Sequence, residues 1–226
     1  MLKEQRIYYG SEKERSFNAW HYDYLDRARC SERWEMPLLE PCSVMPTKLI
    51  GFDYAATCDK FDRGVHFYCN DYVFERLWKR PDQLLGRLKR FECVLTPDFS
   101  IYDAMPLPMQ LWQLFRARLL GQMMQDEGMN VIPSLTWNGP DSYDYCFDGL
   151  PQGGVFAVST VGAVRREESR QVWRDGVEHA INTLEMCGLV VYGTMIDFDN
   201  RGVPVVNVPY RKWVKKDAGV LQARCG

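Results

Sequence analysis

Carboxylates that directly follow short apolar runs are the groups in this chain best suited to acid and base chemistry. Asp98 follows the run at 93–96 and comes several residues before the next helical pattern, so helix capping explains it poorly. Asp71 follows the run at 65–68, where it could either cap the next helix or serve the same chemistry. We predict Asp98 and Asp71 as catalytic groups, with Arg116, at the border of an apolar helical stripe, as a third.

Other polar and aromatic side chains stand at the ends of similar runs. We expect six of them to bind a ligand, namely Asp53, Asn70, Thr96, Trp137, Ser159 and Tyr192. Because ligands bind beyond the carboxyl ends of parallel strands, these side chains should meet at one edge of a sheet. Simpler roles stay open, since Asp53 could form a turn and Trp137 could be a pocket wall or a core residue. A polar pocket with aromatic walls is the usual form of a small-molecule site.

The sequence motifs of several common enzyme classes are absent. The chain contains no G-x-G-x-x-G and no G-x-x-x-x-G-K-[ST], which disfavours dinucleotide-binding and P-loop enzymes. It also lacks the G-x-S-x-G of a serine nucleophile and the H-E-x-x-H of a zinc enzyme. Acid and base catalysis by carboxylates stays compatible with the sequence, which leaves the identity of any cofactor open.

The eight cysteines form no C-x-x-C pair. Structural zinc sites nearly always present such paired ligands, so free thiols in a reducing compartment are the simplest interpretation. Cys69, Cys93 and Cys187 lie in or beside apolar runs, where we expect them to be core residues rather than nucleophiles. No metal site is predicted.

Short apolar runs alternate with helical periodicity along most of the chain. Seven strands are expected, at 49–53, 65–68, 93–96, 131–134, 155–159, 189–192 and 203–208. This alternation predicts an α/β fold with a mostly parallel sheet, either a small or incomplete TIM-barrel-like arrangement, which we favour, or an open doubly wound sheet. Pro204 makes the last strand an edge or closing strand.

The longest predicted helix ends at Gly128 and carries an apolar stripe at Leu111, Phe115, Leu119 and Met123. Arg116 and Arg118 fall on its polar side, where solvated charge is expected. The α/β domain should span 44–209, preceded by an aromatic and charged arm at 1–43 that packs onto it. A basic tail at 210–226 should follow.

Composition narrows the function classes. The net charge of the 226 residues is -2, which offers no general attraction for a phosphate backbone, so nucleic acid is not an expected partner. No stretch approaches the roughly 18 apolar residues of a membrane span, and the first residues lack the apolar core of a signal peptide. We therefore expect a cytoplasmic protein that does not enter a membrane, with its oligomeric state open.

Several segments together resemble a known family. They are VHFY with NDY at 65–72, LTPDFS at 95–100, MQ at 109–110 with Trp112 and Arg116, VIP at 131–133 with Trp137, CFDGLP at 146–151 and AVSTVG at 157–162. They resemble domain of unknown function 4417, a family from bacteriophages and other bacterial mobile elements, over about Leu49 to Gly193. The resemblance implies a phage or prophage context and an α/β domain. It also directs attention to the matching positions Asp71, Asp98, Arg116, Trp137 and Ser159.

Two functions from different classes stay open. The first is an enzyme that processes or binds a polar small molecule, such as a nucleotide or a sugar, at the carboxyl ends of its strands. The second is a non-catalytic protein that engages a host protein or an anti-phage defence component. The aromatic N-terminal arm, which no catalytic argument needs, motivates the second.

Overall fold

The structure is a computed structural model that describes residues 19–210, so the basic tail after Tyr210 and the first part of the arm lie outside it. All paired strands run parallel and in chain order. Four form one sheet: β1 (Leu49–Gly51), β2 (Gly64–His66), β3 (Cys93–Leu95) and β4 (Val131–Ile132). Three form a second: β5 (Val155–Ser159), β6 (Gly188–Tyr192) and β7 (Val205–Val208). The predicted α/β class with a parallel sheet is therefore confirmed.

The two sheets join into one curved layer. A parallel bridge pairs Ser134, just after β4, with Ala157 of β5. In a flat sheet, β2 and β6 would lie about 19 Å apart. The rings of His66 on β2 and Tyr192 on β6 are nevertheless only 4.1 Å apart, so the layer curls strongly toward itself. Among the described residues β1 and β7 pair with no strand on their outer edges, so no barrel closes, and the arrangement is compatible with an incomplete one.

Successive side chains along each strand point alternately to the interior of the curved layer and to its outer surface. Alternate residues of six of the strands, together with Tyr68 after β2, converge on an enclosed apolar cluster, which includes Leu95, Ile132, Ala157, Val190 and Val208. The intervening residues face helices. Both faces are therefore apolar, which explains why the strands read as continuous hydrophobic runs.

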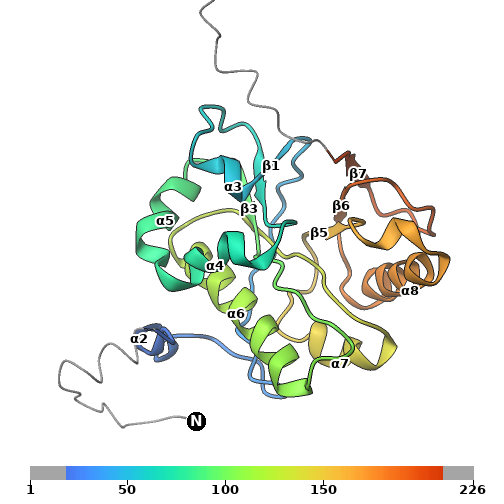
Figure 1. Ribbon diagram of the computed structural model, residues 1–226, viewed down its shortest axis with the longest axis horizontal. Helices are drawn as coiled ribbons and strands as arrows, with labels where there is room; N and C mark the ends of the chain where they lie inside the picture. The colour runs from blue at the N-terminus through green and yellow to red at the C-terminus, as the bar shows by residue number, and fades with distance from the viewer. Residues whose placement is uncertain (1–18, 211–226) are drawn as a thin grey trace, which may run out of the picture.

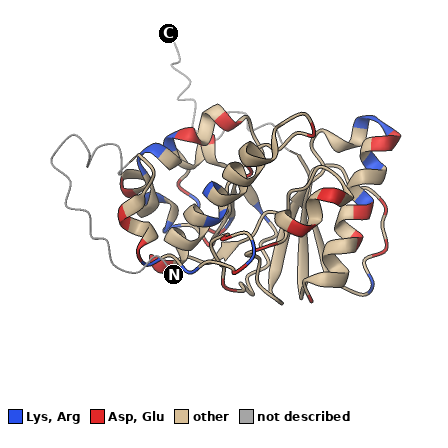
Figure 2. Cartoon of the chain, turned by 90° about the horizontal axis from the view of Figure 1, so that it is seen from below, with Lys and Arg blue, Asp and Glu red and all other residues tan. Residues whose placement is uncertain are grey.

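The helices cover the two halves of the layer separately, as Figure 1 shows. On the half formed by the first four strands lie α3 (Phe52–Ala55), α4 (Asp71–Lys79), α5 (Pro81–Leu88) and α6 (Leu107–Asp126). The other half is covered by α8 (Glu167–Thr183), while α7 (Tyr143–Cys146) lies between β4 and β5 in the chain. A short α2 (Tyr22–Leu25) precedes the sheet and packs Tyr24 against the first half. Acidic and basic residues are interspersed along these helices (Figure 2).

Helix α6 departs from the predicted amphipathic pattern. Leu119, on the expected apolar stripe, is fully buried, but Arg116 and Arg118 on the expected polar side are buried too, at 8% and 2% exposure. The prediction that they are solvated is wrong, because a neighbouring segment covers this side of the helix. Arg118 donates a hydrogen bond of 2.8 Å to the carbonyl of Cys146, at the end of α7. Burial lowers its pKa to about 10.

The segment before β1 closes the amino end of the curved layer. The Val155 N–H donates to the Cys42 carbonyl at 2.6 Å, and the Gly64 N–H donates to the Lys48 carbonyl at 2.9 Å. A Cβ on Gly154 would lie 3.0 Å from the backbone nitrogen of Cys42, so these two segments of the chain are in close contact. Cys42 is buried here. No helix within residues 19–210 is long and apolar enough to cross a membrane.

Candidate functional site

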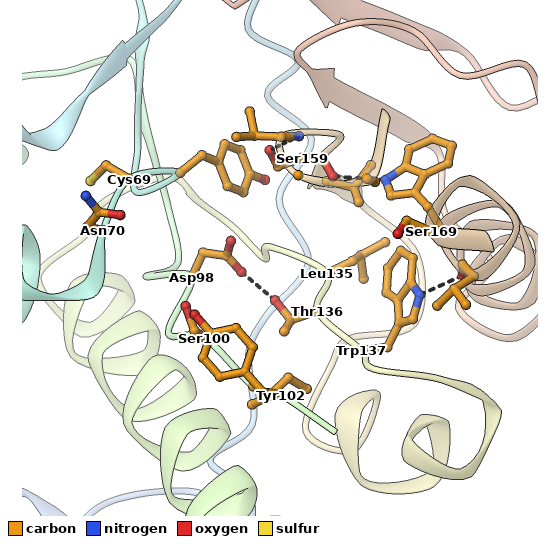
Figure 3. A pocket seen from close by; sticks show the side chains of 18 residues that line it. Cys69, Asn70, Asp98, Ser100, Tyr102, Leu135, Thr136, Trp137, Ser159 and Ser169 are labelled. Carbon is orange, nitrogen blue, oxygen red and sulfur yellow. Dashed lines mark hydrogen bonds between the residues drawn. The ribbon is translucent and has the colours of Figure 1, made fainter. Parts of the chain in front are cut away.

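A cavity of about 600 Å³ lies beyond the carboxyl ends of four consecutive strands, β2 to β5. Its polar lining comes from the segments that leave these strands and from α8: Tyr68, Cys69, Asn70, Asp98, Ser100, Tyr102, Thr136, Trp137, Ser159, Ser169 and Trp173. Figure 3 shows the carboxyl of Asp98 pointing to Thr136, with Ser159 on the far side of the cavity from Ser100 and Tyr102. The parallel register therefore brings four strand ends to one small-molecule-sized space.

Asp98 is the carboxylate of this cavity. It is half-buried, and its Oδ1 accepts a hydrogen bond of 2.5 Å from the Thr136 hydroxyl. Desolvation raises the pKa of Asp98 from 3.8 to about 6, the nearby Asp71 charge adds to the increase, and the Thr136 bond opposes it. The carboxyl therefore changes its protonation state close to neutral pH, which suits a general acid or base.

Asp71 and Arg116 do not line the cavity but position the segment that carries Asp98. Asp71 is the first residue of α4, and its carboxylate accepts hydrogen bonds from the Ser100 N–H at 3.0 Å and the Ser100 hydroxyl at 2.8 Å. Arg116 forms an ion pair with Glu75 at 2.9 Å, and its guanidinium lies 3.9 Å from the Phe99 ring centroid. The structure thus places both predicted catalytic residues in contact with the two residues that follow Asp98 in the chain.

Two tryptophans form the wall contributed by α8 and the segment after β4. The Trp137 indole donates a hydrogen bond of 2.9 Å to the Val172 carbonyl, and the Trp173 indole donates one of 2.9 Å to the Ser159 carbonyl. These bonds use the only polar atom of each side chain, so the indoles present carbon surface to the cavity. The Ser159 hydroxyl accepts from the Val161 N–H at 3.1 Å, which shapes the rim.

The remaining predicted binding residues divide between three places. Asn70 is exposed at the rim of the same cavity. Asp53 and Tyr192 instead line a second cavity. Thr96 lines neither: it is fully buried, its hydroxyl accepts from the Ser134 N–H at 2.8 Å, and its carbonyl accepts from the Ser134 hydroxyl at 2.9 Å. It joins the ends of β3 and β4.

Sequence reasoning missed three aromatic residues of the cavity, Tyr68, Tyr102 and Trp173. The hydroxyl of Tyr68 is enclosed near the Ser134 side chain, which opposes the rise of its pKa, and it forms no hydrogen bond of ordinary geometry with the described residues. Burial first, and then the Asp98 charge, raise its pKa well above the ordinary value, so it stays a neutral donor. Tyr68 lies two residues after the end of β2, and that position is the signal by which it could have been found.

Other chemistries have little support in this cavity. Burial first, and then nearby carboxylates, raise the pKa of Cys69 to about 12, which leaves almost no thiolate at neutral pH. In the part of the chain that the structure describes, no group of three or more His, Cys, Asp or Glu side chains could hold a metal ion. The prediction that Cys187 is a core residue is wrong, since it is exposed after α8. Asp98 is therefore the lining group best suited to proton transfer.

These features define an α/β protein with an open, curved parallel sheet and a polar cavity at its carboxyl edge. Residues 28–209 match the family described as Domain of unknown function (DUF4417), and the chain belongs to this family. The predicted family is confirmed, and its match extends beyond the expected range at both ends.

The relatives come from bacteriophages. The chain is 36% identical over 199 residues to the Gene 1 protein of Mycobacterium phage L5, covering 83% of this chain and 86% of the relative. It is 31% identical over 199 residues to the Gene 1 protein of Mycobacterium phage D29, covering 85% and 73%. No solved structure matches the chain.

Proposed function

We propose that the cavity beyond β2 to β5 binds a polar small molecule, a nucleotide or a sugar, and that Asp98 acts on it as a general acid or base. The observation that carries this proposal is a half-buried carboxyl with a pKa of about 6 in a cavity of about 600 Å³. Such a shifted pKa in a concave site is typical of catalytic groups. The proposed location is the cytoplasm of the bacterial host.

The groups around Asp98 suit a flat or ringed polar ligand. Trp137 and Tyr102 offer aromatic faces on which a base or sugar ring can pack. The neutral hydroxyl of Tyr68, which lies near Ser134, can donate a hydrogen bond to a ligand. Asn70 and Ser159 add polar contacts at the rim.

Ligand binding tests the first half of the proposal. Nucleotides and sugars are screened by isothermal titration calorimetry with the wild-type chain and with Trp137→Ala, which removes an aromatic wall. We expect at least one compound to bind and the variant to bind it about tenfold or more weakly. If no compound binds, or if both proteins bind equally, the cavity is not the proposed site.

Turnover of the bound compound tests the second half. Asp98→Asn keeps the shape of the side chain but removes proton transfer, so the rate should fall 10²-fold or more. Asp82→Asn, on the exposed face of α5, is the matched control and should keep full activity. Equal rates for Asp98→Asn and wild type would refute the acid/base role.

A second candidate, a non-catalytic protein that binds a host or anti-phage defence component, is favoured by one surface feature. Five large apolar side chains at the start of α4, the start of α6 and the loop before α6 are 41–78% exposed: Tyr72, Tyr102, Leu107, Met109 and Trp112. Exposed apolar groups that recur over adjacent elements mark interaction surfaces. If this function holds, a phage that carries Met109→Ser in this protein should lose the benefit that the protein gives it during infection of the host. A phage that carries Asp98→Asn should keep that benefit.

A further inference from the structure

A second cavity of about 590 Å³ occupies the gap between the two edges of the curled layer. It is lined by β1 and the two residues before it on one side and by Val208, Pro209 and Tyr210 on the other. β1 and β7 do not pair with each other, and within residues 19–210 no eighth strand lies between them to close a barrel. The gap therefore exposes backbone edges and side chains that a closed barrel would cover.

The charges in this cavity are unevenly placed. Lys48, Lys60 and Arg63 line it near the amino ends of β1 and β2. Asp53, its one acidic lining residue, follows β1 at the carboxyl end. His66 lines the cavity as well, but burial lowers its pKa to about 3, so it stays neutral. One end of the cavity is consequently cationic.

The cations lack enough acceptors within the described chain. Arg63 is buried, donates one hydrogen bond of 2.9 Å to Asp62, and has an enclosed Nε with no partner among the described residues. The same Asp62 carboxylate also forms an ion pair with the Lys48 ammonium at 2.6 Å. Lys60 forms no ion pair within residues 19–210. A buried guanidinium with unused donors is costly, and an anion would supply the missing acceptors.

We propose that this second cavity binds the phosphate group of a small molecule, with Lys48, Lys60 and Arg63 as its contacts. The planar fork of a guanidinium matches phosphate oxygens, and two lysines supply further positive charge, which suits a dianion better than a single carboxylate. Tyr68 and Cys69 line both cavities, but the cationic end lies at the opposite end of the strands from Asp98. This site is thus separate from the one proposed for acid/base chemistry.

Calorimetric titration of the full chain with inorganic phosphate and with a nucleoside monophosphate, at constant ionic strength, tests the proposal. We expect saturable binding of at least one of them. Tighter binding of the monophosphate supports a phosphorylated ligand, and equal binding supports free phosphate as the ligand of the same site. If neither compound binds, the proposal is overturned.

Variants assign the binding to the cationic end. Lys60→Gln removes an exposed charge that stabilises no described partner, so the chain should fold normally and bind about tenfold more weakly. Lys89→Gln is the control, because Lys89 is exposed, lines neither cavity and, within residues 19–210, forms an ion pair with Glu127 alone. Trp137→Ala, which should weaken binding at the first cavity, should bind phosphate like the wild type, which separates this site from the first. Unchanged binding by Lys60→Gln would overturn the assignment.

Discussion

The indole of Trp137 lies directly against the backbone of Gly176 in α8. A Cβ added at position 176 would be 2.1 Å from Cε2 of the indole, a distance that no real contact reaches. The residue that forms the cavity wall is therefore held in place by the absence of a side chain on the neighbouring helix.

Gly176→Ala should consequently displace Trp137. Because the rigid indole must move and its bond to Val172 is strained, the free energy of unfolding should fall by about 1–3 kcal/mol, measured by chemical denaturation. Tryptophan fluorescence should shift as well. Gly86→Ala in α5 is the control, because a Cβ there meets nothing within 4 Å and should stabilise the helix by about 0.5–1 kcal/mol. Equal effects of the two substitutions would contradict this contact.

Asp98 should make the protein less stable as pH rises. Its pKa of about 6 in the folded state lies above the ordinary 3.8, so between these values the folded state binds more protons than the unfolded state. Stability contributed by this group is therefore lost as pH rises through this range. Asp98→Asn removes the titration, so at pH 8 the variant should equal or exceed the wild type by up to about 3 kcal/mol. Denaturation curves from pH 4 to pH 8 measure the free energy of unfolding of both proteins. If this free energy depends on pH in the same way in the wild type and the variant, the prediction is refuted.

Asp71→Asn should lower the pKa of Asp98, although Asp71 itself does not line the cavity. The asparagine keeps one acceptor for Ser100 but carries no charge, so the pKa of Asp98 should fall toward its ordinary value. The weakened bonds should cost about 1–2 kcal/mol of stability. NMR titration of the Asp98 carboxyl measures the first effect. An unchanged pKa would mean that desolvation alone sets its value.

Two of the seven described cysteines should react with a thiol reagent in the native protein. Cys30 and Cys187 are exposed, whereas four others are buried and Cys69 has a pKa of about 12. Desolvation raises the pKa of Cys30, so its modification should be slowed at neutral pH. Mass-spectrometric mapping of modified residues checks this expectation, and early labelling of Cys93 or Cys146 would contradict it. All eight cysteines of the chain should react in denaturant.

The positions of the strands along the chain could be predicted from the sequence because both faces of the layer are buried. Continuous apolar runs then mark each strand, and the run at 155–159 coincides with β5. The position of Asp98 at a cavity followed from the same argument, since ends of parallel strands share one edge. Pro204 correctly marked the last strand, which pairs only with β6 in the described chain.

The division of the predicted site could not be foreseen, because it depends on how strongly the layer curls. Tyr192 is the last residue of β6 and Asp98 follows β3, yet the curl places Tyr192 beside His66 at the gap. Arg116 was predicted from its border position on a helix, but burial by neighbouring segments and the Glu75 pair are tertiary effects that helical periodicity does not encode.

The hydrogen bond from Val155 to the Cys42 carbonyl also sets an order of events during synthesis on the ribosome. Cys42 leaves the exit tunnel long before Val155 does, so the segment that closes the amino end must wait for the second half of the layer. Until then the apolar residues of β3 and β4 that face the interior have no partners from β5 to β7. Contacts this distant in the chain slow folding and leave partial chains prone to aggregation. Nascent chains of this protein are therefore expected to depend on chaperones of the host cell until β7 has been made.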